Sequence, residues 1–203
     1  LDLVVLAADK DQEFALKGLL DGPPKAGIRQ ICYKLLTHPQ RDPGCFRHSH
    51  EILRPYASSA RFAIVVLDVD GSGCHTQERA ALEAQVESRL AANGWNDRAV
   101  CVAILPEVET WIWSQSPRLP QILGWRDRDL SMADWLSEKG YLESGQVKPA
   151  DPKSALKAVL RQVQKPASSS IFREIAQSIS YTTCQDPAFQ KLLHTLRDWF
   201  PAE

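Results

Sequence analysis

The chain has 203 residues and a mass of 22.7 kDa, enough for one α/β domain with a small helical appendage and a core that needs no cross-links. Its net charge of −1 excludes a protein that is basic over its whole surface, as proteins wrapped in nucleic acid are. The five cysteines are scattered and form no CxxC pair, which predicts reduced thiols in a cytoplasmic protein. The longest apolar runs fall far short of the roughly 20 residues of a membrane span, so we expect no membrane partner.

Apolar runs alternate with helical patterns through the first half of the chain. We expect strands at residues 3–6, 28–36, 62–67 and 99–105, and helices at 14–20, about 47–58 and 77–93. The segment 38–45, HPQRDPGC, is expected to be a loop. This alternation predicts an α/β fold with a mostly parallel sheet flanked by helices.

The pattern changes beyond Pro117, where it becomes helical and is interrupted by proline and glycine. We expect helices near residues 131–139, 152–164, 170–178 and 187–200. The sequence therefore predicts two parts, an α/β core at residues 1–116 and a helical C-terminal extension at 117–203 that packs on the core.

Acidic residues follow three of the four expected strands. Asp9 follows the first, Asp68 and Asp70 end the third in the run AIVVLDVDGSG, and Glu107 and Glu109 follow the fourth. Because the carboxyl ends of parallel strands gather the ligands of such sheets, we expect these acids to converge. Carboxylates are the ligands that Mg²⁺ or Mn²⁺ prefers, and such ions stabilise the attacking and leaving oxygens in phosphodiester cleavage.

Several of these acids also have a purely structural interpretation. Asp9 can cap the following helix, with Gln12 three residues later completing a capping box. Glu107 and Glu109 can lie in the first turn of a helix that Pro106 begins, where the helix dipole favours negative charge. Both interpretations stay open at this point.

Asp68 and Asp70 are harder to explain without a ligand. The two-residue period of a strand places both on the same side, where they repel unless a cation lies between them. A glycine-rich turn needs at most one capping aspartate. Lys10, next to Asp9, is a candidate for stabilising charge on a phosphate during catalysis, although lysines in such places are more often simply solvated.

Two other patterns are weaker candidates for a site. Soft ligands for zinc are present, but their spacing matches no common structural zinc site: Cys45, His48, His50, Cys74 and His75. Trp111 and Trp113 have the chemistry to stack on bases, but aromatic residues in a mostly apolar run more often pack in a core.

A basic face is expected on the helix at 152–164. Lys153, Lys157 and Arg161 recur every four residues, opposite an apolar face, and Lys165 follows. Such a face is usually solvated, but next to a metal site it is a candidate surface for binding DNA or RNA through phosphate contacts.

The order of several blocks resembles a bacterial family of DUF4276-type proteins. The blocks are AADKDQEFALKGLL, HPQRDPGC, VVLDVDGSG, LPEVETWIWS, KPADPKSALKAVL and CQDPAFQKLL, and they cover nearly the whole chain. The acidic turn and the later D-x-D pair also resemble the Toprim-like fold of topoisomerases, primases and OLD-type nucleases. Related proteins occur in anti-phage gene clusters such as the methylation-associated defence system. Toprim domains carry Glu-Gly directly after the first strand, where this chain has Ala7 and Ala8.

Together these features predict a Toprim-like protein that acts as a metal-dependent nuclease, or nuclease-like component, of bacterial anti-phage defence. Asp68 and Asp70 would hold Mg²⁺ or Mn²⁺, Asp9 would complete the site or activate water, and Glu107 and Glu109 would support it. The alternative is a non-catalytic adaptor that uses the same fold to bind a methyltransferase or another defence protein.

Overall fold

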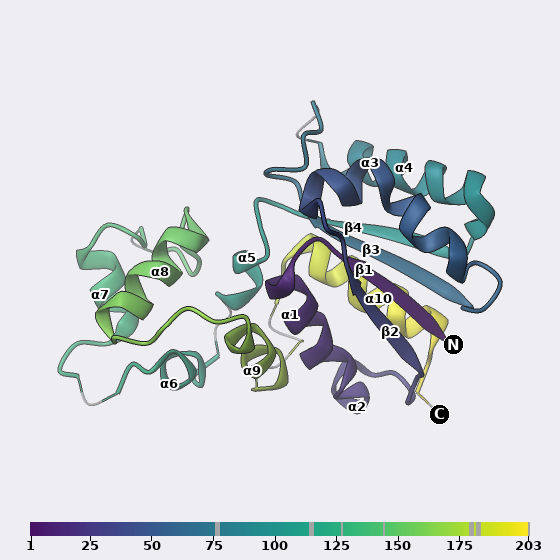
Figure 1. Ribbon diagram of the computed structural model, residues 1–203. Helices are drawn as coiled ribbons and strands as arrows, with labels where there is room; N and C mark the ends of the chain where they lie inside the picture. Colours follow the sequence, from purple (N-terminus) through teal and green to yellow (C-terminus); the bar gives the residue numbers. More distant parts are fainter. Residues whose placement is uncertain are drawn as a thin grey trace.

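A four-stranded parallel sheet lies at the centre of the protein, as a computed structural model of residues 1–75, 78–113, 116–126, 128–143, 145–178, 181 and 184–202 shows (Figure 1). The spatial order of the strands is β2-β1-β3-β4, and all neighbouring pairs are parallel. Their bounds are β1 Leu3–Ala7, β2 Tyr33–Thr37, β3 Phe62–Asp68 and β4 Ala99–Ile104. The expected α/β class and parallel sheet are confirmed.

Helices cover both faces of the sheet. On one face α3 (Arg41–Leu53) and α4 (Arg79–Leu90) pack on side chains such as Val65 and Leu67, and on the other α1 (Lys10–Leu20) and α10 (Pro187–Trp199) pack on Ile64 and Val66 (Figure 1). Because successive strand residues point to opposite faces, Asp68 continues the Ile64–Val66 row and lies on the α1 side. The near-continuous apolar runs of β1 and β3 reflect burial on both faces.

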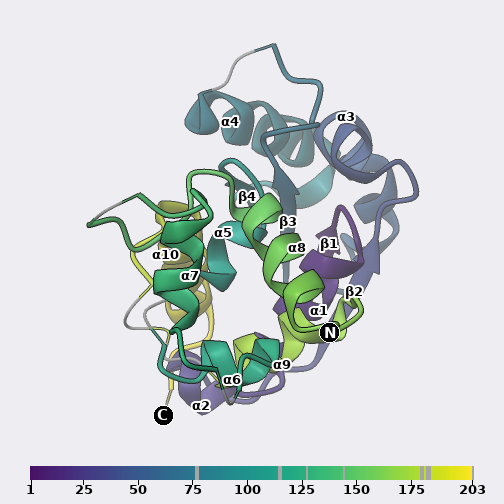
Figure 2. The same cartoon turned by 90° about the vertical axis from the view of Figure 1, so that its left-hand side faces the viewer.

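The second half of the chain is helical, as expected. Its helices are α5 Glu109–Ile112, α6 Leu119–Leu123, α7 Met132–Glu138, α8 Pro152–Gln162 and α9 Ser170–Ser178. Helix α9 packs closely on α1, where a Cβ on Gly18 would lie 2.7 Å from the backbone oxygen of Arg173. Helix α8 contacts α5 and lies beyond the carboxyl ends of the strands (Figures 1 and 2). One apolar cluster contains residues of both the 1–116 and the 117–203 parts.

Some element bounds differ from the expected ones. The second strand begins at Tyr33 rather than 28, while Ile28 forms an isolated bridge with Pro201. Helix α3 begins at Arg41, six residues before the expected start. Its first turn contains Gly44, where a Cβ would lie 2.1 Å from Nδ1 of His38. This close local contact explains a glycine that the sequence pattern assigned to a loop.

Helices α1 and α4 also differ at their ends. Helix α1 starts at Lys10, four residues earlier than its apolar spacing suggests. Helix α4 runs on into a π-helical turn at Ala91–Trp95, where Gly94 takes a φ of +90° and ends the helix as expected. The expected start of this helix, Gln77, lies outside the described residues. Two short elements complete the structure, α2 Pro23–Ala26 and the 3₁₀ turn Arg54–Tyr56.

Carboxylates cap the open edge of β4. Glu83 Oε1 accepts a hydrogen bond from the Ala103 N–H at 3.0 Å, and Glu87 Oε1 accepts one from the Cys101 N–H at 2.9 Å. Lys191 of α10 lies 3.0 Å from a carboxylate oxygen of each glutamate and balances their charge. These bonds satisfy edge donors that would otherwise invite pairing with another strand. Among the described helices, none has both the length and the apolar character needed to cross a bilayer.

Candidate metal centre

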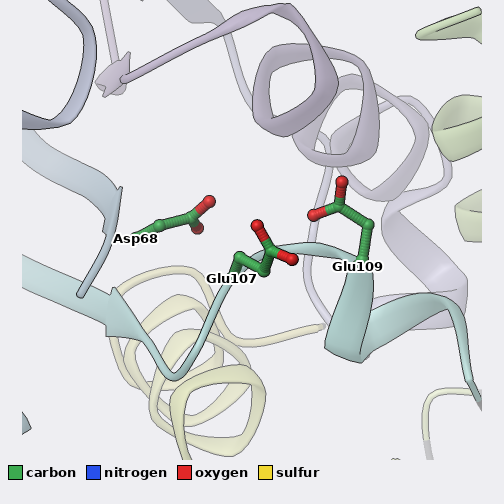
Figure 3. A group of neighbouring side chains, drawn as sticks. All are labelled: Asp68, Glu107 and Glu109. Atoms are coloured by element: carbon green, nitrogen blue, oxygen red, sulfur yellow. The ribbon is translucent and has the colours of Figure 1, made fainter. Parts of the chain in front are cut away.

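Three carboxylates meet at the carboxyl edge of the sheet. Asp68 ends β3, Glu107 lies in the loop after β4, and Glu109 is the first residue of α5. One oxygen from each lies within 4.8 Å of the others, and the side chains point toward a common space (Figure 3). The strand register explains the meeting, because Asp68 pairs with Ile104 and the chain then turns back across the strand ends. We call Asp68, Glu107 and Glu109 the acidic triad; carboxylates gathered in this way are able to hold a divalent ion.

The surroundings of Asp68 strongly disfavour ionisation of its carboxyl group. Its side chain is 6% exposed, and its Oδ1 accepts a 2.9 Å hydrogen bond from Nε2 of Gln12. Burial raises the pKa of Asp68 well above its ordinary value, and nearby carboxylates raise it further: Asp42, Asp9 and Glu109. A cation at this position would remove most of that penalty.

Gln12 orients the Asp68 carboxylate, a role the sequence did not reveal. It is fully buried, and its Oε1 accepts a 2.9 Å hydrogen bond from the Ala8 N–H. With the amide oxygen engaged there, the amide NH₂ group faces Asp68. Asp9 caps α1 by accepting from the N–H groups of Asp11 and Gln12, as the capping interpretation expected. The return bond of Gln12 goes to Ala8 instead of Asp9.

Asp42 is a second residue that sequence reasoning missed. Its Oδ1 accepts a 2.7 Å hydrogen bond from the backbone N–H of Asp68, so it fixes the end of β3. Burial raises the pKa of Asp42, and the charge of Asp9 raises it further. The available signal was that Asp42 follows the second strand, the one strand with no acid assigned to it. The assignment of residues 38–45 to a loop concealed that signal.

Lys153 brings a positive charge from α8 to the triad. Its Nζ lies 2.6 Å from Oε2 of Glu107 and 3.5 Å from Oε1 of Glu109. Burial alone lowers the pKa of Lys153, but the bond to Glu107 and the charge of Glu109 outweigh it and raise that pKa above its ordinary value. Burial raises the pKa of Glu109, and Lys153 opposes the rise. Oε2 of Glu109 is buried and has no hydrogen-bond partner among the described residues.

The other residues predicted for the site are not members of the triad, and they differ in exposure and in their partners. Asp70 is exposed and does not belong to the triad. Burial is the main reason that the pKa of Asp68 is raised, and the nearby carboxylate of Asp9 raises it further. Lys10 is exposed and forms a 2.6 Å ion pair with Glu13 on its own helix.

The basic residues expected on or just after α8 have different surroundings. Lys153 turns toward the acidic triad, and Lys165 donates to the backbone oxygen of Ile122 at the end of α6. Lys157 and Arg161 remain exposed. The apolar side of the helix is buried, as its periodicity predicts.

The two weaker patterns take no part in the centre. Within the described part of the chain, the acidic triad is the one group of side chains placed to hold a metal ion. The cysteines and histidines considered for zinc form no such group there. Trp111 and Trp113 are buried and donate through Nε1 to Asp186 Oδ1 and to the backbone oxygen of Pro152, each at 3.0 Å. Their role is packing, which was the favoured interpretation.

An open polar cleft adjoins the triad. It has a volume of about 390 Å³, and its lining includes Asp9, Lys10, Asp11, Arg41 and Lys153. The lining therefore mixes cationic and anionic side chains. No family model matches the chain, and no curated protein or solved structure matches it. The chemistry of the triad and its cleft is therefore the basis for assigning a function.

Proposed function

We propose that this protein is a metal-dependent phosphodiesterase that cleaves DNA or RNA at the acidic triad. The observation that carries the proposal is the convergence of Asp68, Glu107 and Glu109 at the carboxyl edge of a parallel sheet. That edge is where sheets of this class bind their ligands.

The donor set of the triad fits Mg²⁺ or Mn²⁺. All of its donors are carboxylate oxygens, which hard divalent cations prefer. Oε2 of Glu109 has no partner among the described residues, and burial raises the pKa of Asp68, so Lys153 alone leaves part of the centre without a counter-charge. A bound ion of this kind supplies Lewis acidity and stabilises the charge that develops on phosphate oxygens.

Residues of the chain itself would prepare the site for a phosphodiester. Gln12 and Asp42 hold Asp68 in place through its side chain and its backbone. Lys153, whose side chain is 45% exposed, is placed to donate to a phosphate oxygen once an ion takes over the charge of Glu107 and Glu109. Asp9 and Asp70 remain predicted ligands; in this arrangement Asp9 caps α1 and Asp70 faces solvent.

The resemblance to DUF4276-type proteins supports a place in bacterial anti-phage defence. In that setting the substrate would be foreign DNA or RNA, and a methyltransferase of the same system is a candidate partner.

The proposal is tested by calorimetric titration with Mn²⁺ alone, followed by cleavage assays on single-stranded and duplex oligonucleotides. We expect the wild type to bind Mn²⁺, and Asp68→Asn and Glu109→Gln to weaken binding at least about tenfold, because each removes an anionic ligand. Glu138→Gln, an exposed acid on α7, serves as the matched control and should bind as the wild type does. Asp70→Asn measures whether the exposed member of the D-x-D pair contributes.

One observation favours the adaptor as a second candidate function. The ammonium of Lys153 already neutralises part of the triad, so the site has a stable arrangement without an ion. A non-catalytic subunit would retain that ion pair permanently. It would show no Mn²⁺ binding in the same titration, and its target would be a protein of the defence system.

A further inference from the structure

A second hollow also has Lys153 in its lining. It has a volume of about 260 Å³ and is formed by α8, the segment 167–169 and α9, with Asp11 and Glu109 at one end. It shares Asp11, Lys153 and Ser169 with the polar cleft, so the two hollows meet beside the acidic triad.

The walls of this hollow differ from those of the polar cleft. Leu156 and Leu160 of α8 line one side, and Ile171 and Phe172 of α9 line the other. The lining also includes polar side chains, among them Asp11, Ser168 and Ser169. The exposed ammonium of Lys157 stands at the rim. The hollow therefore suits a ligand with a flat apolar body, a polar edge and an attached anion.

Glu109 connects this hollow to the acidic triad. Glu109 is 4% exposed, lines this hollow and also belongs to the triad. A ligand that fills the hollow would therefore lie next to a residue of the metal centre.

We infer that this hollow, which we call the nucleoside pocket, binds the base and sugar of one unpaired nucleotide whose phosphate lies at the acidic triad. The inference rests on the proposed function and names its substrate class. Sites for drug-sized ligands measure roughly 300–1,000 Å³, so a hollow of about 260 Å³ accepts one nucleoside and not a stacked pair. A base held between α8 and α9 must leave the duplex, and the preferred substrate is therefore a single-stranded segment or end.

The first test compares two probes in the presence of saturating Mn²⁺. We expect thymidine 5′-monophosphate to bind the full-length wild type at least about tenfold more tightly than inorganic phosphate, because only the nucleotide buries an apolar surface. Equal binding of the two probes would overturn the inference.

Two variants fill the pocket without touching the triad. Ala167→Phe and Ser168→Trp enlarge exposed residues of the lining, and both should abolish the preference for the nucleotide while leaving Mn²⁺ affinity and the melting temperature unchanged. Ala84→Phe, an equivalent change at an exposed position of α4 on the opposite face of the sheet, should retain the preference. Retention of the preference in both filled variants would also overturn the inference.

Cleavage assays separate this inference from the proposed function. Wild-type protein that binds Mn²⁺ and cuts blunt duplex as well as single strands would support the proposed function and refute the nucleoside pocket. Failure to bind Mn²⁺ at all would refute the proposed function, and the inference that rests on it would fall as well.

Discussion

Replacing Asp68 with asparagine should stabilise the metal-free protein at neutral pH and have little effect at pH 4. Burial, with the charges of Asp42, Asp9 and Glu109, raises the pKa of Asp68 well above its ordinary value, so the folded protein binds this proton more tightly than the unfolded chain. Stability is therefore lost as the pH rises from about 4 toward the folded pKa, at about 1.4 kcal/mol for each pKa unit of difference. Asparagine resembles the protonated acid and cannot ionise.

The magnitude follows from the burial of the carboxylate. With a folded pKa well above the unfolded one, we expect Asp68→Asn to raise the free energy of unfolding at pH 7.5 by at least about 1 kcal/mol relative to its effect at pH 4. Urea unfolding in EDTA at the two pH values measures the difference. Added Mn²⁺ should then raise the melting temperature of the wild type more than that of the variant. Parallel pH profiles, or equal shifts with Mn²⁺, would refute the reasoning.

Four further variants test other parts of the structure. Lys153→Met should lower the melting temperature in EDTA and tighten Mn²⁺ binding in calorimetry, because the ammonium competes with the ion; weaker Mn²⁺ binding would contradict this. Gln12→Leu should cost about 3 kcal/mol in urea unfolding, since the Ala8 N–H and Asp68 both lose a buried partner. Lys191→Met should cost about 2 kcal/mol in the same assay, discounted for partial exposure, and a neutral result would show that the β4 edge needs no charge balance. The double variant Lys157→Glu, Arg161→Glu should abolish salt-sensitive retention on DNA or RNA at low salt and change the melting temperature by no more than a few degrees. If the wild type is not retained either, these two residues are only solvent-exposed charges.

The backbone layout and the triad were accessible from the sequence because local patterns determine them. Apolar runs buried on both faces predicted the parallel strands, and the strand ends predicted that five acids would converge. Three of the five form the triad: Asp68, Glu107 and Glu109. The two-residue period of the D-x-D pair predicted that Asp70 would lie beside Asp68, but Asp70 is exposed and is not part of the triad. The chain leaves the sheet after Asp68, so the alternation that predicts a shared face no longer applies beyond it.

The features that the sequence did not predict depend on how particular side chains pack. Pro43 and Gly44 read as a turn, yet proline is tolerated in a first helical turn, and Gly44 is required by the ring of His38. The start of α3, and with it the place of Asp42, was therefore hidden. Periodicity placed Lys153 on the polar side of α8 correctly, but only the packing of α8 against α5 turns that side chain toward the triad.

Anomalous diffraction from crystals grown with Mn²⁺ tests the central claim most directly. The account predicts a peak at roughly 2.0–2.5 Å from oxygens of Asp68, Glu107 and Glu109, with Nζ of Lys153 moved away from Glu107. No peak at the triad, with the Lys153–Glu107 pair intact at millimolar Mn²⁺, would contradict it.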